Sequence, residues 1–205
     1  MFTRKNCDFV PYQQARARLC DGDVLLCSLR IRWYNPLDWL LPLIAIGTRS
    51  WCVHAAMVVQ LRGCIYCVQE TTTEDHHLRL SEVVKRWPGR VHVYRPRWDK
   101  THMVPHWSGV MAADHMLRLS GKRYGWLNLF RVACRLLPIV WRILPKDTDD
   151  AEKSMFPPFC SAAVSEAIRT TTGLDLVSDK PDRLTTPRDL AESKHLKYLF
   201  TLDWK

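Results

Sequence analysis

Apolar residues alternate with polar ones over several short stretches of the chain, and this period of two predicts β-strands. The run "VLLCSL", which follows the turn signal "DGD", predicts a first strand. Residues 51–60 and 64–70 alternate or run apolar around Arg62 and Gly63, which predicts a β-hairpin. "RVHVYRP" alternates like a further strand that Pro96 closes. Together these stretches predict a mainly antiparallel sheet.

Helical spacing and helix boundary signals appear between and after these stretches. They predict helices over 8–20, 81–87, 104–120, 126–144 and the stretch "PPFCSAAVSEAIRTTTG". Two prolines precede the last of these and Gly173 ends it, so Cys160 is expected in its first turn. In "LTTPRDLAES", Thr186 is expected to cap a short helix. Strands and helices in this order predict an α+β fold with helices on the flanks of the sheet.

The size and composition suit one domain over residues 1–205, with residues 1–16 and the C-terminal tail at its periphery. The longest apolar run, "LDWLLPLIAIG", is too short to span a bilayer, and the start of the chain lacks the apolar core of a secretion signal. Synthesis in the cytosol is therefore expected, and the site of action stays open. In that compartment the eight cysteines are expected to be reduced thiols.

Thirty Lys and Arg against 21 Asp and Glu give a formal charge of +9. This charge favours anionic partners such as lipid headgroups or acidic cell-wall polymers. The basic residues are spread along the chain and no zinc-finger, RRM or KH pattern occurs, so a specific nucleic-acid partner is not expected.

Three residues carry the candidate chemistry. A three-residue hairpin loop would place His54 directly opposite Glu70, close enough for the carboxylate to hold the imidazole, whereas a one-residue change would put the two on opposite faces. Cys160 at a helix N-terminus feels the positive end of the helix dipole, which stabilises a thiolate. A thiolate, an imidazole and an orienting carboxylate are the parts of cysteine-nucleophile acyl transfer.

Six motifs then add a resemblance: "GDVLLCSLR", "TRSWCVHAAMVV", a strand ending in Glu70, "GKRYGWLNL", "FCSAAVSEAI" and "TPRDLAES". In this order they resemble the circularly permuted NlpC/P60 cysteine hydrolases of the YiiX/YaeF type, within the papain-like superfamily. The resemblance runs from about residue 17 to residue 193. It implies a circularly permuted papain-like fold, with a mainly antiparallel sheet or partial barrel flanked by helices.

The same resemblance assigns the roles of the site residues. It makes Cys160 the nucleophile, His54 the general base and Glu70 the residue that orients the base, with Tyr124 lining the site near the oxyanion. Ser161 is also expected to line the site. It implies cleavage of an amide bond in a peptide or in peptidoglycan through an acyl-enzyme, with no metal or organic cofactor. The oligomeric state is not indicated.

Two other functions remain open on the sequence. The permuted branch also resembles acyltransferases that act on lipids, and the basic, apolar segment 127–144 suits an anionic lipid surface. Alternatively, the positive charge serves a non-catalytic binding module. Cys64 and Cys67 form a CxxC pattern, but their spacing on a strand sends the two side chains to opposite faces, which disfavours a metal site.

Overall fold

The computed structural model describes residues 7–28, 50–70, 77–100, 104–120 and 159–204. The strands are β1 (Phe9–Pro11), β2 (Val24–Ser28), β3 (Cys52–Leu61), β4 (Cys64–Val68), β5 (His77–Arg79), β6 (Val91–Pro96) and β7 (Leu196–Asp203). The helices are α1 (Tyr12–Ala15), α3 (Leu80–Arg86), α4 (Pro105–Leu119), α6 (Cys160–Thr172) and α7 (Pro187–Glu192), with 3₁₀ turns η1 (Arg16–Arg18), η3 (Trp98–Lys100) and η5 (Asp182–Leu184). The helix predicted over 126–144 lies outside the described residues.

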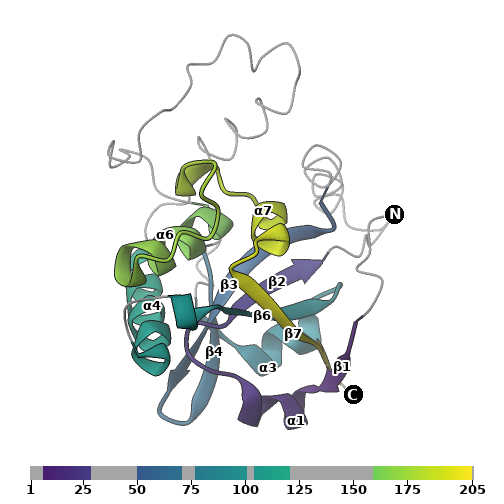
Figure 1. Ribbon diagram of the computed structural model, residues 1–205. Coiled ribbons are helices and arrows are strands. Elements are labelled where there is room, and N and C mark those ends of the chain that lie inside the picture. Colours follow the sequence, from purple (N-terminus) through teal and green to yellow (C-terminus); the bar gives the residue numbers. More distant parts are fainter. Residues whose placement is uncertain (1–6, 29–49, 71–76, 101–103, 121–158, 205) are drawn as a thin grey trace.

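The described strands form one open sheet in the order β1-β7-β6-β2-β3-β4-β5 (Figure 1). All neighbours are antiparallel except β1 and β7, which run parallel. The predicted α+β class with a mainly antiparallel sheet and flanking helices is therefore confirmed. Strand β3 lies between β2 and β4 and carries His54 near its start, in the part of the strand that pairs with β2 but not with β4.

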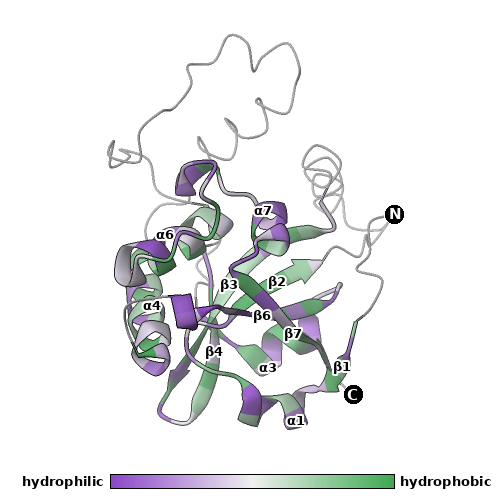
Figure 2. Ribbon diagram, viewed as in Figure 1, coloured by the Kyte–Doolittle hydropathy of each residue, from purple (hydrophilic) through white to green (hydrophobic). Residues whose placement is uncertain are grey.

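Both faces of the sheet are covered. One face packs against α4, α6 and α7, and its core includes Met57 of β3, Met116 of α4, Ile168 of α6 and Leu190 of α7. The other face packs against α1 and α3. Figure 2 shows that the central strands are hydrophobic along most of their length, as expected for strands buried on both sides. No described helix is long and apolar enough to cross a membrane.

The β3–β4 hairpin turns through two residues. Leu61 pairs with Cys64, so that only Arg62 and Gly63 lie in the loop. Their φ angles are 50° and 75°. Positive φ at both positions is the geometry of a type I′ turn, whose twist matches that of the flanking strands. The predicted hairpin is confirmed, but its predicted three-residue loop is wrong, which changes the register of every pair.

The helices after residue 159 follow the sequence signals. Gly173 ends α6 with φ 72° and its N–H bonds to the carbonyl of Arg169. Thr186 caps α7 in a capping box with Asp189, and Pro187 occupies its first turn. The N-terminal prediction is less accurate, because 8–20 contains the short strand β1 and only one turn each of α1 and η1.

Candidate active site

His54 lies next to an irregularity in β3. It pairs directly with Cys27 of β2, but the next pair along joins Ser28 to Cys52, so Val53 is an extra residue in β3. An inserted residue of this kind is a β-bulge, which bends the strand and re-aims the neighbouring side chains. The bulge therefore sets the direction in which the His54 ring leaves the sheet.

Cys160 is the first residue of α6. Phe159 before it has an extended backbone, with φ −98° and ψ 174°, so the helix begins abruptly at the cysteine. The thiol is almost completely buried, at 5% exposed, and packs with Phe159, Ala162 and Leu184. Its position confirms the expectation that Cys160 lies in the first turn, where the N–H groups have no intrahelical acceptor.

His54 and Cys160, which are far apart in the sequence, form a hydrogen bond. The backbone N–H groups of Ala55 and Ser161 also donate to the sulfur. The β3–β4 ladder ends at Met57 and Val68, so Ala55 lies beyond the part of β3 that β4 covers. The start of α6 approaches β3 in this uncovered stretch.

The electrostatics of the pair favour charge separation. Burial opposes ionisation of the thiol, but the charge of His54 and hydrogen bonds from His54, Ala55 and Ser161 outweigh it, so the pKa of Cys160 lies below its ordinary value. Burial likewise opposes protonation of the imidazole. The charge of Cys160 and the hydrogen bonds to Cys160 and Gln69 outweigh it, which raises the pKa of His54. Both shifts favour a thiolate–imidazolium pair.

Gln69 holds the other side of the imidazole. The distance from His54 Nε2 to Gln69 Oε1 is 2.8 Å, and Gln69 is only 8% exposed. An amide oxygen accepts, so Nε2 carries a proton and donates it to Gln69. Since Nε2 is engaged, Nδ1 is the nitrogen that faces the sulfur of Cys160.

The predicted pairing of His54 with Glu70 is therefore wrong. The two-residue loop shifts the register by one, and a shift of one residue moves every side chain to the other face. If the observed register is continued beyond Val68, Gln69 comes opposite Ala56, two residues from His54. Gln69 is then a diagonal neighbour of His54 on the same face of the sheet, and its long side chain can reach the imidazole. Glu70 is buried, at 1% exposed, one position further along the chain.

Trp87 covers one face of the His54 ring. The two ring centroids are 5.8 Å apart and the planes differ by 24°. Trp87 Nε1 donates to the carbonyl of Ser28 at 2.9 Å, which anchors the indole to the end of β2. Sequence reasoning missed this residue because the stretch after α3 carries no chemical motif, and only the fold brings it to the site.

Two predicted lining residues have different outcomes. Tyr124 and the basic segment 127–144 lie outside the described residues. The Ser161 side chain does not line the site, since it is fully buried and donates to the Thr185 carbonyl at 2.7 Å. Only the backbone N–H of Ser161 faces the thiol.

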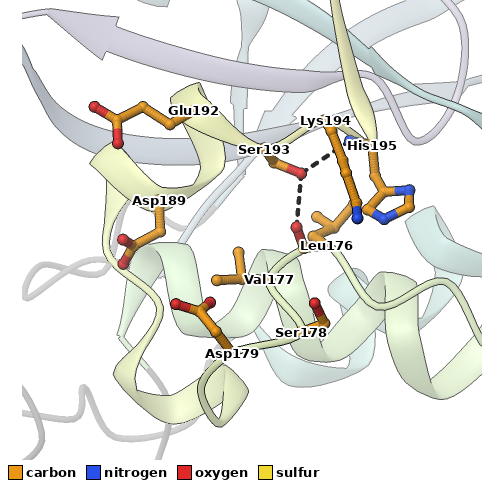
Figure 3. Close-up of a pocket in the computed structure, with 9 residues that line it drawn as sticks. All are labelled: Leu176, Val177, Ser178, Asp179, Asp189, Glu192, Ser193, Lys194 and His195. Carbon is orange, nitrogen blue, oxygen red and sulfur yellow. Dashed lines mark hydrogen bonds between the residues drawn. The ribbon is translucent and has the colours of Figure 1, made fainter.

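Other polar features of the described chain lie apart from this pair. A shallow hollow between α7 and the segment before it is lined by nine residues, none of which belongs to the site: Leu176, Val177, Ser178, Asp179, Asp189, Glu192, Ser193, Lys194 and His195 (Figure 3). Its Ser193 hydroxyl donates to the Leu176 carbonyl at 2.6 Å and ties the two segments together. Within the described ranges, no group of three or more His, Cys, Asp or Glu residues is arranged to hold a metal ion.

The fold is similar to that of a solved structure from Escherichia coli. The structure described as metalloprotein yiiX from Escherichia coli O157:H7, DUF1105, superimposes with a TM-score of 0.51 at 14% sequence identity, over 91% of this chain and 98% of that chain. No protein-family model matches the sequence, and no curated protein matches it. The similarity shows a YiiX-like fold, as the sequence resemblance led us to expect.

Proposed function

We propose that this protein is a cysteine hydrolase that works through an acyl-enzyme at Cys160. One observation carries the proposal: a cysteine at the first position of a helix is hydrogen-bonded to a histidine whose other ring nitrogen is held by a buried amide. Nucleophile, base and orienting group in hydrogen-bonded sequence are the arrangement that activates a thiol. The pKa shifts of Cys160 and His54, in opposite directions, support the same interpretation.

The proposed reaction has two halves. The Cys160 thiolate attacks the substrate carbonyl carbon, and N–H groups in the first turn of α6 stabilise the oxygen that becomes negative. The His54 imidazolium then gives its proton to the leaving group as the carbon–heteroatom bond breaks. In the second half, neutral His54 takes a proton from water, which attacks the thioester and releases the acid and the thiol.

The sequence resemblance refines the proposal. The motifs resemble those of the permuted NlpC/P60 hydrolases of the papain-like superfamily, and this resemblance implies an amide bond in a peptide or peptidoglycan as the substrate. The YiiX-like fold supports the resemblance. The structural relative is described as a metalloprotein. The proposed chemistry here is carried by the thiol and imidazole themselves.

The first test measures the reactivity of the thiol without any substrate. The purified chain is treated with iodoacetamide from about pH 5 to 9, and labelling at each of the eight cysteines is followed by mass spectrometry. We expect Cys160 to react fastest at low pH and to lose that advantage in His54→Ala. Cys20 is a built-in comparison. It is exposed to the reagent, and partial desolvation raises the pKa of its thiol, so no thiolate is stabilised there.

If Cys160 reacts no faster than Cys20 at low pH, the proposed nucleophile is wrong, and the binding module with a net positive charge becomes the better hypothesis. If Cys160 is activated, turnover is then measured on matched amide and ester substrates, including acyl lipids in vesicles, with Cys160→Ala as the blank. Turnover of acyl lipids but not of amides would favour the lipid-directed alternative. Its sequence basis, 127–144, lies outside the described residues.

A further inference from the structure

Helix α6, which begins with the nucleophile, presents two different faces to its neighbours. Its apolar residues, such as Val164 and Ile168, pack into the core beneath the sheet. Ser161, Ser165 and Arg169 follow one another at intervals of four and so lie on one side of the helix. We call these three residues the polar stripe of α6. Ser161 and Ser165 are fully buried.

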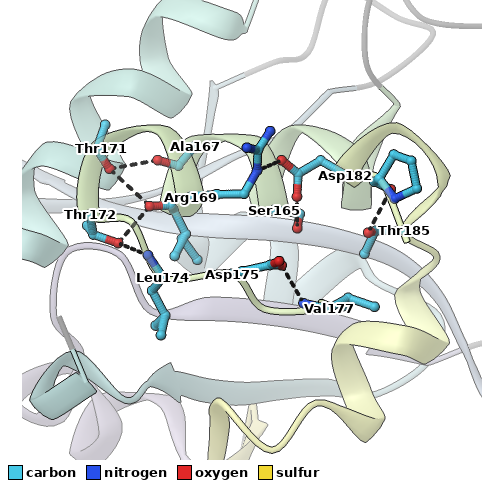
Figure 4. Close-up of polar contacts among 12 residues, drawn as sticks. Ser165, Ala167, Arg169, Thr171, Thr172, Leu174, Asp175, Val177, Asp182 and Thr185 are labelled. Atoms are coloured by element: carbon cyan, nitrogen blue, oxygen red, sulfur yellow. Dashed lines mark hydrogen bonds and ion pairs between the residues drawn. The ribbon is translucent and has the colours of Figure 1, made fainter. Parts of the chain in front are cut away.

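Every member of the polar stripe bonds to the short segment that contains η5. The Ser161 hydroxyl donates to the Thr185 carbonyl at 2.7 Å. The Ser165 hydroxyl donates to Asp182 Oδ1 at 2.6 Å, and Arg169 Nε donates to Asp182 Oδ2 (Figure 4). Asp182 is 6% exposed and Ser165 is fully buried, whereas the Arg169 side chain is about a third exposed. One carboxylate thus joins two turns of α6 to η5.

These bonds supply what apolar packing does not. Burial of apolar surface is non-directional, so Val164 and Ile168 stabilise contact with the core over a range of helix rotations. Hydrogen bonds weaken steeply when they are misaligned. The polar stripe therefore restricts rotation of α6 about its own axis. The same η5 segment also places Leu184 against Cys160 and Phe159.

Cys160 is the residue directly before the stripe, so the rotation of α6 decides where its sulfur points. We propose that Asp182 is a positioning residue, which holds α6 through Ser165 and Arg169 so that Cys160 stays aligned with His54. This inference deepens the proposed function and rests on it, because it concerns the same nucleophile. Asp182 itself acts only through the helix.

The test compares the pH profile of Cys160 alkylation by iodoacetamide in four full-length variants. Asp182→Ala removes both bonds, whereas Asp182→Asn keeps an oxygen acceptor for Ser165 and loses the ionic partner of Arg169. Ser165→Ala removes one hydroxyl of the stripe. Thr171→Ala is the matched control, since the Thr171 hydroxyl bonds within α6 to the Ala167 carbonyl at 2.7 Å and makes no link to η5 (Figure 4).

We expect the alkylation midpoint to move to higher pH in Ser165→Ala and Asp182→Asn, and furthest in Asp182→Ala. A shift of half to one unit corresponds to a loss of roughly threefold to tenfold in rate below the midpoint. Thr171→Ala should keep the wild-type profile. Circular dichroism at the assay temperature identifies any variant that is unfolded. If Asp182→Ala is unfolded, the alkylation profiles of Ser165→Ala and Asp182→Asn test the inference instead.

Two results would overturn the inference. If the Asp182 and Ser165 variants melt at lower temperature but keep the wild-type profile, Asp182 is structural only, and the proposed function still stands. If Thr171→Ala shifts the profile as much as Ser165→Ala, the effect comes from the helix in general. Failure of the proposed function looks different, since wild-type Cys160 would then show no low-pH reactivity that depends on His54.

Discussion

The two ends of strand β3 are built differently. From Met57 to Leu61 the strand pairs regularly with β4 and enters a two-residue turn. From Cys52 to Ala56 it contains a bulge at Val53 and extends beyond the end of the β4 ladder. The regular end is closed by its own hydrogen bonds. The irregular end leaves a backbone N–H and a histidine available to the thiol of another element.

Each end also holds a pair of ionisable groups, and the pairs differ in the same way. At the regular end, the backbone N–H of Val58 donates to the backbone carbonyl of Asp23. Arg95 donates to both carboxylate oxygens of Asp23, at 2.7 and 2.8 Å. Asp23 accepts a further bond from the Cys20 N–H. The Asp23 carboxylate is thus held by several fixed donors, which stabilises the fold. In the His54–Cys160 pair both pKa shifts favour transfer of a proton from the thiol to the imidazole, which is the basis of the proposed reaction.

The largest expected effect comes from the irregular end. His54→Ala removes the proposed base and the positive charge that lowers the pKa of Cys160. Loss of a general acid–base group typically costs about 10²- to 10⁴-fold in turnover. At a pH below the ordinary thiol pKa, alkylation of Cys160 should fall by roughly 100-fold. The melting temperature should change little, which distinguishes this variant from those at the other end.

The contrast predicts the reverse for Arg95. In Arg95→Ala the buried carboxylate of Asp23 loses its partner, and removing one member of a buried pair typically costs about 3–5 kcal/mol. We expect the lower end of that range, since Arg95 is about a third exposed. Urea unfolding measures the loss, and Cys160 alkylation in the folded protein should be unchanged.

A matched control removes an ion pair at the surface. Arg118→Ala breaks the exposed pair with Asp114 on α4, and this should cost at most about 0.5 kcal/mol. If Arg95→Ala also slows alkylation of Cys160, the two ends are coupled, and the division between a stabilising and a chemical end is wrong.

Local rules of sequence predicted the regular parts of the molecule. Strands β2, β3, β4 and β6 lie where apolar or alternating stretches predicted them, and α6 begins and ends where its prolines and Gly173 indicate. Strand β7 was not predicted. It pairs with β6 through contacts between residues about 100 positions apart, such as His92 and Thr201, and no local pattern indicates such a partner.

The residues of the candidate site also differ in whether local sequence signals indicate them. Cys160 and His54 were found from helix-start position and strand placement, and the structure brings them together. Gln69 was missed because its selection depends on the loop length of the hairpin, and one residue of loop decides between Gln69 and Glu70. Trp87 was missed because its contact with His54 depends on how α3 packs beside the sheet. Register and packing are long-range properties.

Gln69 offers a sharper test of the irregular end. Its bond helps to raise the pKa of His54, so Gln69→Ala should lower that pKa. The imidazolium is then lost at lower pH, and the thiolate that it stabilises forms at higher pH. The bell-shaped profile of kcat/KM should therefore narrow from both sides, with a loss of about tenfold at its maximum, near the net value of a hydrogen bond to a charged group.

The neighbouring Glu70→Gln variant is the comparison for Gln69→Ala. It changes one group in a residue that is also buried but lies one position along the chain. The pH profile of kcat/KM for Glu70→Gln should keep the wild-type width. If this profile narrows in Glu70→Gln but not in Gln69→Ala, Glu70 is the orienting residue and the assignment of Gln69 is wrong.

The smallest expected effect lies at the regular end, in the turn itself. Gly63 has φ 75°, and a Cβ added there would meet no atom within 4 Å, so Gly63→Ala costs only the strain of a left-handed backbone, about 1 kcal/mol. For a chain of this size that lowers the melting temperature by about 2–4 °C. Arg62→Asn should raise it slightly, because asparagine tolerates the φ of 50° at that position better than arginine. Neither variant should alter Cys160 alkylation. A change in the alkylation profile of either one would mean that the turn adjusts the register of β3 at His54, and that the two ends of the strand act as one unit.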